Sequence, residues 1–435
     1  MDQAIRTLTY ESVEGIINGK MLKAFSITAL AIAIKNIFEI DINQYVITFM
    51  AAAIMPFLNY SQLLCYSASI IPIAEGMNGG ILWVILALLF NKKSSSSPTS
   101  IKIYVLSILI IELANLFLNN GTIDFKLYFF YSSYIILFFY ITFLNINDKQ
   151  AKSILLMYLL GLSVLCIIIV CRILFTMSID EFLATHSRIG YAETEFNNDI
   201  GYLNVNPNSL GYYSIVGITI FFTTASHLKL PLLLKILLLT SFIIAGALTI
   251  SRSWIIILTF CLVWILLRNI TNIKYWFVLL VATFAIIQFD ILPHNIIDSF
   301  TERFNTESLE TAGGRSTIFE EYNDYLSSHP ERIPFGVGTL ITNEVVRASH
   351  SPHNGTQQVI VGCGVVGFLV FFAAACKFYT KYIRGRSIPL IMFMPFVAAS
   401  LFLQTIQFLM PFSLILPLAM TTIVFKIRPR KVINS

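Results

Sequence analysis

The sequence predicts an all-α polytopic membrane protein that forms a single membrane domain over residues 1–435. Hydrophobic residues make up 56% of the chain and charged residues only 12%, so a water-soluble fold would lack the polar surface to cover its core. The mean hydropathy is +0.76, and the apolar residues form repeated runs bounded by polar residues, as transmembrane helices do. A transmembrane barrel would show short alternating segments instead, and the sequence has none.

Fourteen apolar runs follow one another along the chain, and each predicts a membrane span. The first four are short compared with the ~20 residues that a helix needs to cross the hydrocarbon core. If one pair stays out of the membrane, twelve spans remain and both chain ends keep their side. The runs cover residues 24–38, 43–57, 60–74, 79–91, 101–118, 127–146, 153–176, 207–226, 230–249, 253–268, 273–291, 358–378, 388–405 and 408–425.

Positive charge sets the predicted orientation of these spans. With the N-terminus in the cytoplasm, most basic residues fall in cytoplasmic segments or at the inner ends of helices, and most acidic residues fall outside. The segment 91–102, NKKSSSSPTSIK, becomes a polar inner loop. Both termini are therefore predicted to be cytoplasmic, and the polar, acid-bearing N-terminus is not expected to be a cleavable signal peptide.

Two long segments are predicted outside the membrane, at about 177–206 and about 292–357. They hold most of the remaining arginines, against the usual bias of positive residues toward the cytoplasm. The planar guanidinium fork suits phosphate or carboxylate groups, so these arginines either pair with outer acidic residues or bind an anionic ligand. They are Arg188, Arg303, Arg315, Arg332 and Arg347, and Arg252 lies at a third outer turn.

Arg252 and Arg315 are the least easily explained as loop salt bridges. Arg252 lies in LTISRSWIIIL, between two predicted spans with almost no loop, where a cation must pair, snorkel or face a wet cavity. Arg315 opens a predicted helix that ends at His329 and Pro330, and an arginine in a first turn adds to an end that already favours anions. That helix is amphipathic and is predicted to lie on the outer membrane surface. Its apolar stripe is Ile318, Phe319, Tyr322, Tyr325 and Leu326.

His350, His353 and Asn354 lie where the polar stretch ASHSPHNGTQQ turns into an apolar run. Either histidine could be a structural residue, a general base or a hydrogen-bond donor to phosphate. A zinc pair would need further ligands, and the sequence has no HExxH motif. The following helix is predicted to begin near Gln358.

Glycines mark two places where backbone is predicted to come close to something else. PFGVGT, at 334–339, reads as a turn whose backbone can approach a ligand. In the helix after His353, glycines at close spacing predict tight helix packing. These are Gly362, Gly364 and Gly367.

A fourth polar stretch, at 186–214, contains Arg188 and the sequence NPN. Asn206 and Asn208 lie just before a predicted helix, with Asn208 as its N-cap and Gly211 following. The sequence shows no P-loop, no Rossmann fingerprint and no DxD motif, and EID at 39–41 only loosely resembles the last of these.

These four stretches, in this order, resemble the O-antigen polymerase/ligase superfamily. The shared motifs are NPNSLG, TISRS, GGRSTIF with PFGVGT, and HNGTQQVIVGCGVVG, over roughly residues 186–370. The last fits the pattern of His-Asn, nine residues, Gly, two residues and Gly, while the N-terminal third matches only as membrane helix. The resemblance implies a GT-C-like glycosyltransferase of lipopolysaccharide biosynthesis in the bacterial inner membrane. It would take a glycan from undecaprenyl pyrophosphate on the periplasmic face without a metal.

The resemblance also implies roles for the candidate residues. Arg252 and Arg315 would stabilise the pyrophosphate leaving group, and His353 would activate the acceptor hydroxyl or hold the phosphate. No cofactor is expected. The implied partners are an undecaprenyl-pyrophosphate-linked oligosaccharide, membrane lipid and a chain-length regulator protein, and nucleic acid is not expected. The substrate-binding candidates are Arg188, Asn206, Asn208, His350 and Asn354.

Three functions stay open on the sequence. The span count and the two arginine-bearing outer loops favour a polymerase of the Wzy type over a ligase that transfers the glycan to lipid A–core. A transporter or flippase is the third, because Glu112 and Arg172 lie inside apolar runs, as coupling residues often do. The chain shows no convincing internal repeat of the kind that transporters usually have.

Overall fold

The all-α prediction is confirmed over the residues that the computed structural model describes, where every regular element is a helix and no strand occurs. Eleven of the fourteen predicted runs coincide wholly or partly with these helices, and the runs 79–91, 273–291 and 388–405 lie outside the described residues. The described residues are 16–76, 99–119, 125–176, 178, 181, 205, 207–228, 230–249, 251–268, 315–348, 354–384 and 415–427.

Three of the described helical segments are long and apolar enough to cross a membrane, namely Ile101–Leu118, Asp148–Phe175 and Gly355–Ile383. They support the reading of the chain as a helical membrane protein. The elements in order are α2 Gly19–Ile37, α3 Gln44–Ile54, η1 Met55–Phe57, α4 Tyr60–Ile70, η2 Ile71–Gly76, α6 Thr99–Leu118, α7 Phe125–Phe143, α8 Asp148–Thr176, α10 Pro207–Leu228, α11 Leu232–Leu248, α12 Arg252–Arg268, α15 Arg315–Ser328, η4 Pro330–Arg332, α16 Thr342–Val346, α17 Gly355–Phe378, η5 Tyr379–Ile383 and α19 Ile415–Val424.

Asparagine side chains begin several of these helices. The Asn18 Oδ1 accepts the backbone N–H of Met21 at 3.0 Å at the start of α2. Asn59 and Gln62 form a reciprocal capping box at the start of α4, with both hydrogen bonds near 3 Å. An asparagine before an apolar run therefore marks a helix start in this chain, because it satisfies an amide that the first turn leaves without a partner.

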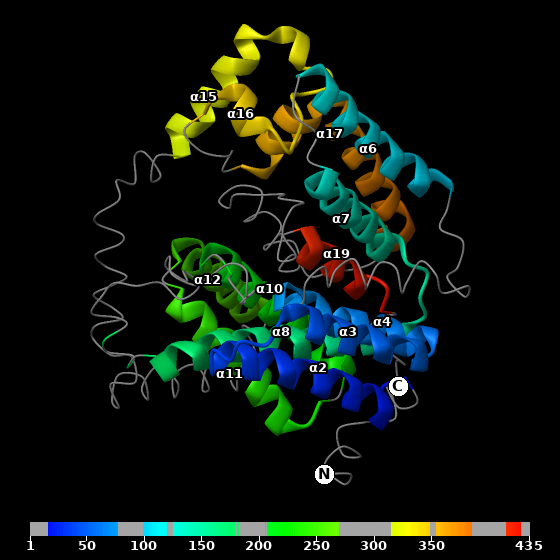
Figure 1. Ribbon diagram of the computed structural model, residues 1–435, viewed down its shortest axis with the longest axis vertical. Coiled ribbons are helices and arrows are strands. Elements are labelled where there is room, and N and C mark those ends of the chain that lie inside the picture. The colour runs from blue at the N-terminus through cyan, green and yellow to red at the C-terminus, as the bar shows by residue number, and fades with distance from the viewer. Residues whose placement is uncertain are drawn as a thin grey trace.

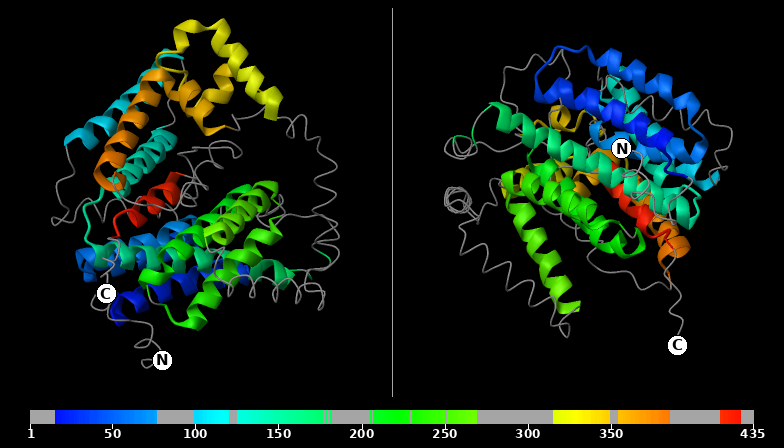
Figure 2. Two further views of the ribbon diagram at one scale, coloured as in Figure 1. Left: turned by 180° about the vertical axis from the view of Figure 1, so that it is seen from behind. Right: turned by 90° about the horizontal axis from the view of Figure 1, so that it is seen from below.

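Helix α8 lies at the centre of one group of helices, where it contacts α2, α4, α10, α11 and α19. Its Ser163 hydroxyl lies 2.7 Å from that of Ser241 on α11, both buried. Figures 1 and 2 show α2, α3, α8, α10 and α11 gathered in this group. Long apolar side chains fill the space between the helices, so the buried core is made by packing along α8.

A second group consists of α6, α7, α15, α16 and α17, which Figure 1 draws toward the other end of the molecule. Helix α17 packs along α6, and the rings of Phe139 on α7 and Phe371 on α17 stack at 5.9 Å. Helix α19 joins the two groups, because it contacts α7 as well as α8 and α10.

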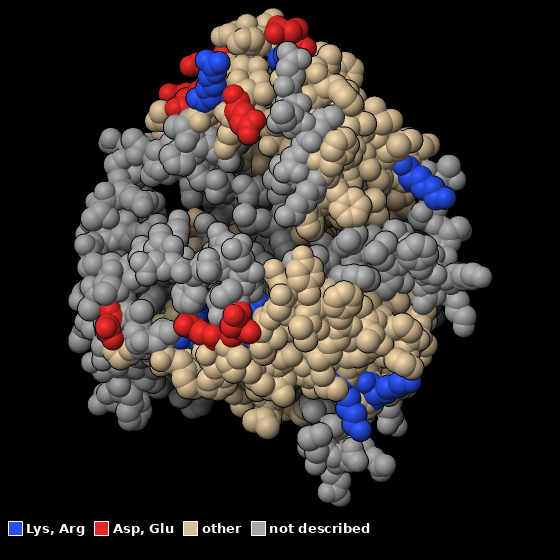
Figure 3. Space-filling model, viewed as in Figure 1, with Lys and Arg blue, Asp and Glu red and all other residues tan. Residues whose placement is uncertain are grey.

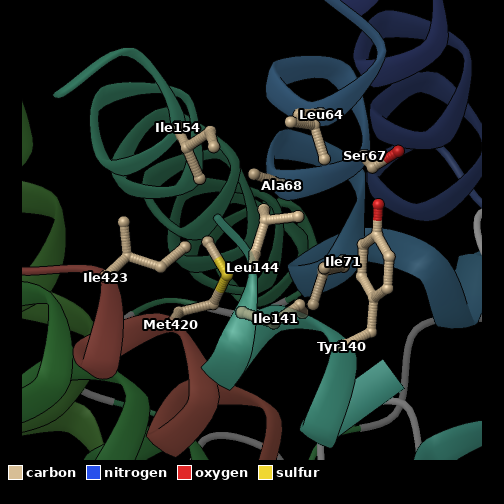
Figure 4. A pocket seen from close by; sticks show the side chains of 10 residues that line it. All are labelled: Leu64, Ser67, Ala68, Ile71, Tyr140, Ile141, Leu144, Ile154, Met420 and Ile423. Atoms are coloured by element: carbon tan, nitrogen blue, oxygen red, sulfur yellow. The ribbon is translucent and has the colours of Figure 1, made fainter. Parts of the chain in front are cut away.

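The distribution of charged side chains on the surface and the lining of an internal cavity limit where a polar site can lie. On the face drawn in Figure 3, charged side chains of the described residues lie in separate groups at the top, at the left below the middle and at the lower right, and the surface of α6 and α17 carries few of them. A cavity between α4, α7, α8 and α19 has no charged side chain among its described lining residues, and Figure 4 shows mainly aliphatic side chains around it. Its lining consists of Leu64, Ser67, Ala68, Ile71, Tyr140, Ile141, Leu144, Ile154, Met420 and Ile423. Asn208 and Asn354, the polar candidates whose side chains the structure describes, are not among these residues.

Candidate functional site

Each of the four candidate stretches leads into the first turn of a helix. Arg252 is the first residue of α12, Arg315 is the first residue of α15, and Asn354 is the N-cap of α17. Asn208 was predicted to be an N-cap but is the second residue of α10, which begins at Pro207. Helix N-termini expose amides without partners and carry the positive end of the helix dipole, so all four positions favour a nearby anion.

The structure locates these candidates unequally. The backbones of Arg252 and Arg315 are placed, whereas their side chains lie outside what the structure describes. Four other candidates lie wholly outside the described residues, namely Arg188, Asn206, His350 and His353. Asn208 and Asn354 are placed with their side chains, and both are partly exposed.

The stretches NPNSLG and TISRS meet at the seam between α10 and α12. The Ser251 hydroxyl, one residue before Arg252, donates to the Asn208 Oδ1 at 3.4 Å. Further along, the Trp254 indole N–H of α12 donates to the Ser214 hydroxyl of α10 at 3.1 Å. Residues 43 positions apart in the sequence are thus neighbours, and the first turns of α10 and α12 lie together.

A close contact with α11 fixes this seam. A Cβ added to Gly246 would lie 2.1 Å from the Trp254 Nε1 and 2.5 Å from the Ser214 Oγ, so only glycine fits there. Ser214 also donates to the backbone carbonyl of Phe242 at 2.6 Å. The three helices α10, α11 and α12 are therefore joined by buried hydrogen bonds directly behind the Arg252 turn.

Helix α17 begins at Gly355, three residues before the predicted start near Gln358. The Asn354 side chain explains the earlier start, because its Oδ1 accepts the backbone N–H groups of Thr356 at 2.9 Å and Gln357 at 3.1 Å. The oxygen is therefore used within the protein, and the amide nitrogen is the part of Asn354 that is not needed for the cap. A substrate-binding role for Asn354 would have to use that nitrogen.

Gln357 connects the start of α17 to α15. Its Nε2 donates to the Phe319 carbonyl at 2.9 Å and to the Asn323 Oδ1 at 3.2 Å. Because Gln357 lies in the first turn of α17 and Phe319 lies one turn into α15, the two stretches that carry His353 and Arg315 are held side by side. This contact joins the GGRSTIF stretch to the HNGTQQ stretch, just as the α10–α12 seam joins NPNSLG to TISRS.

Helix α15 packs on the protein through part of its predicted apolar stripe. Ile318 and Tyr322 are buried with Val337 and Val361 in a small core, whereas Phe319 is 44% exposed. Burial, with a smaller effect of the Glu321 charge, raises the pKa of Tyr322, so the phenol keeps its proton. It donates to the Asn343 Oδ1 at 2.8 Å and so fixes α16 against α15.

Helix α17 is broken at Gly364, and the glycine-rich PFGVGT stretch fills the break. Gly364 has a φ of 69° and a ψ of −176°, which opens the hydrogen-bond ladder around it. A Cβ there would lie 2.3 Å from the Pro334 carbonyl oxygen. The predicted tight packing at Gly364 is therefore between α17 and a loop rather than between two helices.

The 333–340 loop pairs with backbone groups on both sides of the break. The amides of Val337 and Gly338 donate at 2.8 Å to the carbonyls of Val361 and Gly362. In return, the amides of Val365 and Val366 donate to the carbonyls of Ile333 at 2.9 Å and Pro334 at 3.0 Å. The backbone of this loop thus comes close to α17, and its predicted approach to a ligand stays a prediction.

A polar stripe on α6 was not identified as part of the site from the sequence. Glu112, Asn115 and Asn119 are spaced by three and four residues, so they share one face of the helix. The Glu112 carboxylate accepts the amides of Thr339 at 2.8 Å and Leu340 at 2.9 Å. The stripe therefore faces the 333–340 loop, and its spacing within an apolar helix is the sequence signal that could have revealed it.

The described residues thus form two assemblies, the α10–α12 seam and the α15–α17 contact. Figures 1 and 2 draw the two assemblies at different levels of the molecule. Within the part of the chain that the structure describes, no cluster of three metal-ligating His, Cys, Asp or Glu side chains occurs.

No protein-family model, no curated protein and no solved structure matches the chain. A functional proposal therefore rests on the residues of the two assemblies and on the order of their motifs.

Proposed function

We propose that the chain is an O-antigen polymerase, a membrane glycosyltransferase that moves a growing glycan from undecaprenyl pyrophosphate onto a new lipid-linked repeat unit. The observation that carries the proposal is that the four motif stretches all lead into helix N-termini, two of which begin with an arginine. The leaving group, undecaprenyl pyrophosphate, is a polyanion, and a guanidinium at a helix N-terminus is a fitting partner for it.

The reaction assigned to these residues is a substitution at the sugar carbon that bears the pyrophosphate. An acceptor hydroxyl oxygen forms the new bond to that carbon, the carbon–oxygen bond to the pyrophosphate breaks, and the acceptor proton passes to a base. His353, next to the N-cap of α17, is our candidate for that base. Arg252 and Arg315 stabilise the charge that grows on the leaving group, which lowers the barrier more than equal binding of substrate would.

The physical form of the substrate also agrees with this chain. An undecaprenyl tail needs an apolar environment, and a sugar acceptor needs polar loops. The chain supplies apolar helices that are long enough to cross a membrane and, at the start of α15 and α17, polar stretches rich in Arg, His and Asn. We place the reaction at the periplasmic face of the bacterial inner membrane, with both chain termini in the cytoplasm.

The transporter reading loses its main support. Glu112 accepts two backbone amides of the 333–340 loop, and the Arg172 Nε lies 3.4 Å from the Glu39 Oε1. Each residue therefore has a partner within the protein, which is the structural alternative to a coupling role.

A lipopolysaccharide gel of a deletion strain tests the proposal. The strain is complemented with wild type, Arg315→Ala, His353→Ala or the matched control Arg347→Asn. Arg347 ends α16 at a left-handed φ of 58°, which asparagine tolerates, so this control removes an arginine that is not at a helix N-terminus. Wild type and the control should restore a ladder, while the other two variants should leave core bearing a single repeat unit.

The other outcomes of this gel are equally informative. Bare core in the deletion strain, with long chains retained on the lipid carrier, would identify a ligase. A ladder that is unaffected by the deletion would overturn the glycosyltransferase proposal.

A further inference from the structure

We propose that Glu112 is a positioning residue that clamps the 333–340 loop onto the broken helix α17 and thereby sets the orientation of the α17 N-terminus. The activity part of this inference rests on the proposed function, because it concerns the segment that carries His353 and Asn354. The clamp itself does not, since it can be measured by chemistry that is independent of glycan synthesis.

The clamp begins with a carboxylate that uses both of its oxygens. Glu112 is completely buried, and its Oε2 and Oε1 accept the consecutive amides of Thr339 at 2.8 Å and Leu340 at 2.9 Å. A buried carboxylate with no such partners would be strongly unfavourable in an apolar helix. The pairing is therefore mutual, because the loop amides satisfy Glu112 and Glu112 holds the loop.

Two asparagines of α6 hold the carbonyl side of the same loop. The Asn115 Nδ2 donates to the Phe335 carbonyl at 2.8 Å and approaches the Gly362 carbonyl at 3.4 Å. The Asn119 Nδ2 donates to the Val337 carbonyl at 2.9 Å. The Glu112 carboxylate accepts hydrogen bonds from loop amides, and the two asparagines donate to loop carbonyls. One face of α6 therefore satisfies both kinds of backbone group of the loop, as a neighbouring strand would.

The break at Gly364 gives this clamp its consequence. An intact helix would transmit its orientation along its whole length, but at Gly364 the ladder between residues 355–363 and 365–378 is interrupted. The four loop hydrogen bonds to Val361, Gly362, Val365 and Val366 bridge the interruption. The direction of the α17 N-terminus, with its Asn354 cap, therefore depends on a loop that α6 holds in place.

A natural thiol next to the loop offers a direct probe of the clamp. The Thr339 Oγ1 lies 3.3 Å from the Sγ of Cys363, one residue before the break. In the variant Thr339→Cys, an added oxidant can take two electrons from the two thiols, which lose two protons and form a disulfide. Its rate of formation reports how much of the time the loop lies against α17.

The first measurement compares disulfide formation by Thr339→Cys with and without Glu112→Gln, in membranes treated with copper phenanthroline. Glutamine keeps the size of the side chain, but its NH2 group replaces one of the two carboxylate oxygens. That NH2 group then faces a loop N–H, so two hydrogen-bond donors oppose each other. We expect the equilibrium between the closed and the open loop to shift about tenfold toward the open loop, as for the loss of one hydrogen bond to a charged group, and the rate to fall with the closed population. The same change in a carboxylate that does not touch the loop, Glu39→Gln, should leave the rate unchanged.

The second measurement asks whether the disulfide replaces the clamp. Glu112→Gln alone should shorten the lipopolysaccharide ladder or reduce it to single repeats, and Thr339→Cys in the same chain should restore the ladder while the disulfide is intact. Thr339→Ser, which cannot form the bond, should not restore it. A purely destabilising effect of Glu112→Gln would lower the amount of folded protein in the membrane, so the membrane level of each variant is measured in parallel.

The outcomes separate this inference from the proposed function. Equal disulfide rates with and without Glu112→Gln, or a ladder that stays lost despite a complete disulfide in folded protein, would overturn the clamp. If Glu112→Gln fails to fold, Asn115→Leu replaces it, with the same expected fall in rate. If the gene deletion leaves the ladder unchanged, the proposed function is wrong, and the disulfide rates still decide whether Glu112 holds the loop.

Discussion

Asn354 has a structural role that the structure shows and a substrate-binding role that we propose. Its oxygen caps α17 by accepting the amides of Thr356 and Gln357, while its amide nitrogen is not used in that cap. The sequence placed Asn354 among the substrate-binding candidates without this distinction. The capping role therefore belongs to the Asn354 Oδ1, and a substrate-binding role would belong to its Nδ2.

Two substitutions separate the cap from any contact with substrate. Asn354→Asp keeps an oxygen for the cap and loses the amide donor, whereas Asn354→Ala loses both. We expect Asn354→Ala to destabilise the protein by about 1 kcal/mol and Asn354→Asp to leave stability nearly unchanged. Thermal unfolding of the detergent-purified variants, monitored by tryptophan fluorescence, measures the difference.

The lipopolysaccharide ladder then reports the functional end of the same side chain. If the Asn354 amide donates to the substrate, Asn354→Asp should shorten the ladder although its stability is intact. A normal ladder for Asn354→Asp would restrict Asn354 to the role of a cap. Equal stability of wild type and Asn354→Ala would contradict the cap itself.

Among the elements, α17 shows how far sequence patterns reach. Its apolar run predicted a helix, which is present, whereas its glycines predicted tight packing between helices, and at Gly362 and Gly364 the close neighbour is a loop. The break at Gly364 could not be predicted, because glycine is also tolerated within a regular helix. The deciding partner is the 333–340 loop, whose hydrogen bonds take over the backbone groups that the break exposes.

The break makes Gly364 sensitive to the smallest possible enlargement. In Gly364→Ala, the alanine would have to adopt a φ of 69°, which it disfavours. Its Cβ would also lie 2.3 Å from the Pro334 carbonyl oxygen. The strained backbone alone costs about 1–3 kcal/mol, and the clash adds to it, so we expect a clear loss of thermal stability. The unfolding temperature of the purified variant checks this.

Gly19→Ala is the matched control for that measurement. Gly19, like Gly364, is a helical glycine, and it is the first residue of α2. A Cβ at this position meets nothing within 4 Å. Alanine also favours a helix relative to glycine, so Gly19→Ala should leave stability unchanged or raise it by up to about 1 kcal/mol. An unfolding temperature for Gly364→Ala that matches wild type would mean that α17 is unbroken in solution.

The stripe of Glu112, Asn115 and Asn119 marks the limit of prediction from sequence at this scale. The run around Glu112 predicted an apolar helix, and α6 is long and apolar enough to cross a membrane, yet the glutamate pointed toward a transporter. The loop amides that explain it lie 227 and 228 positions away in the chain. Such a pairing cannot be deduced from local periodicity, because periodicity gives the face of a helix but not what lies against it.

For the whole molecule, the motifs are joined in pairs in the order in which they occur. NPNSLG meets TISRS at the α10–α12 seam, and the Arg315 stretch meets the Asn354 stretch through Gln357. The resemblance named these four stretches together, and the structure gives a physical contact within each pair. The proposed function adds that Arg252 of the first pair and Arg315 of the second bind the same pyrophosphate.

The orientation of the molecule in the membrane is predicted by charge alone. The threading places Lys20, at the start of α2, in the cytoplasm and Ser328, at the end of α15, in the periplasm. Both residues are exposed, so a cysteine at either position can react with a membrane-impermeant maleimide. The six native cysteines are first replaced by alanine, so that each protein carries one thiol.

We expect Ser328→Cys to be labelled in intact cells whose outer membrane has been made permeable, and Lys20→Cys to be labelled only after the inner membrane is disrupted. The physical reason is that lysines and arginines crossing the membrane are costly, so they hold the inner ends of the spans in the cytoplasm. The loss of one pair of spans among the first four would not change either result, because both positions keep their side. Labelling of Lys20→Cys in intact cells would invert the topology and place the starts of α15 and α17 in the cytoplasm, where a periplasmic transfer from undecaprenyl pyrophosphate could not occur.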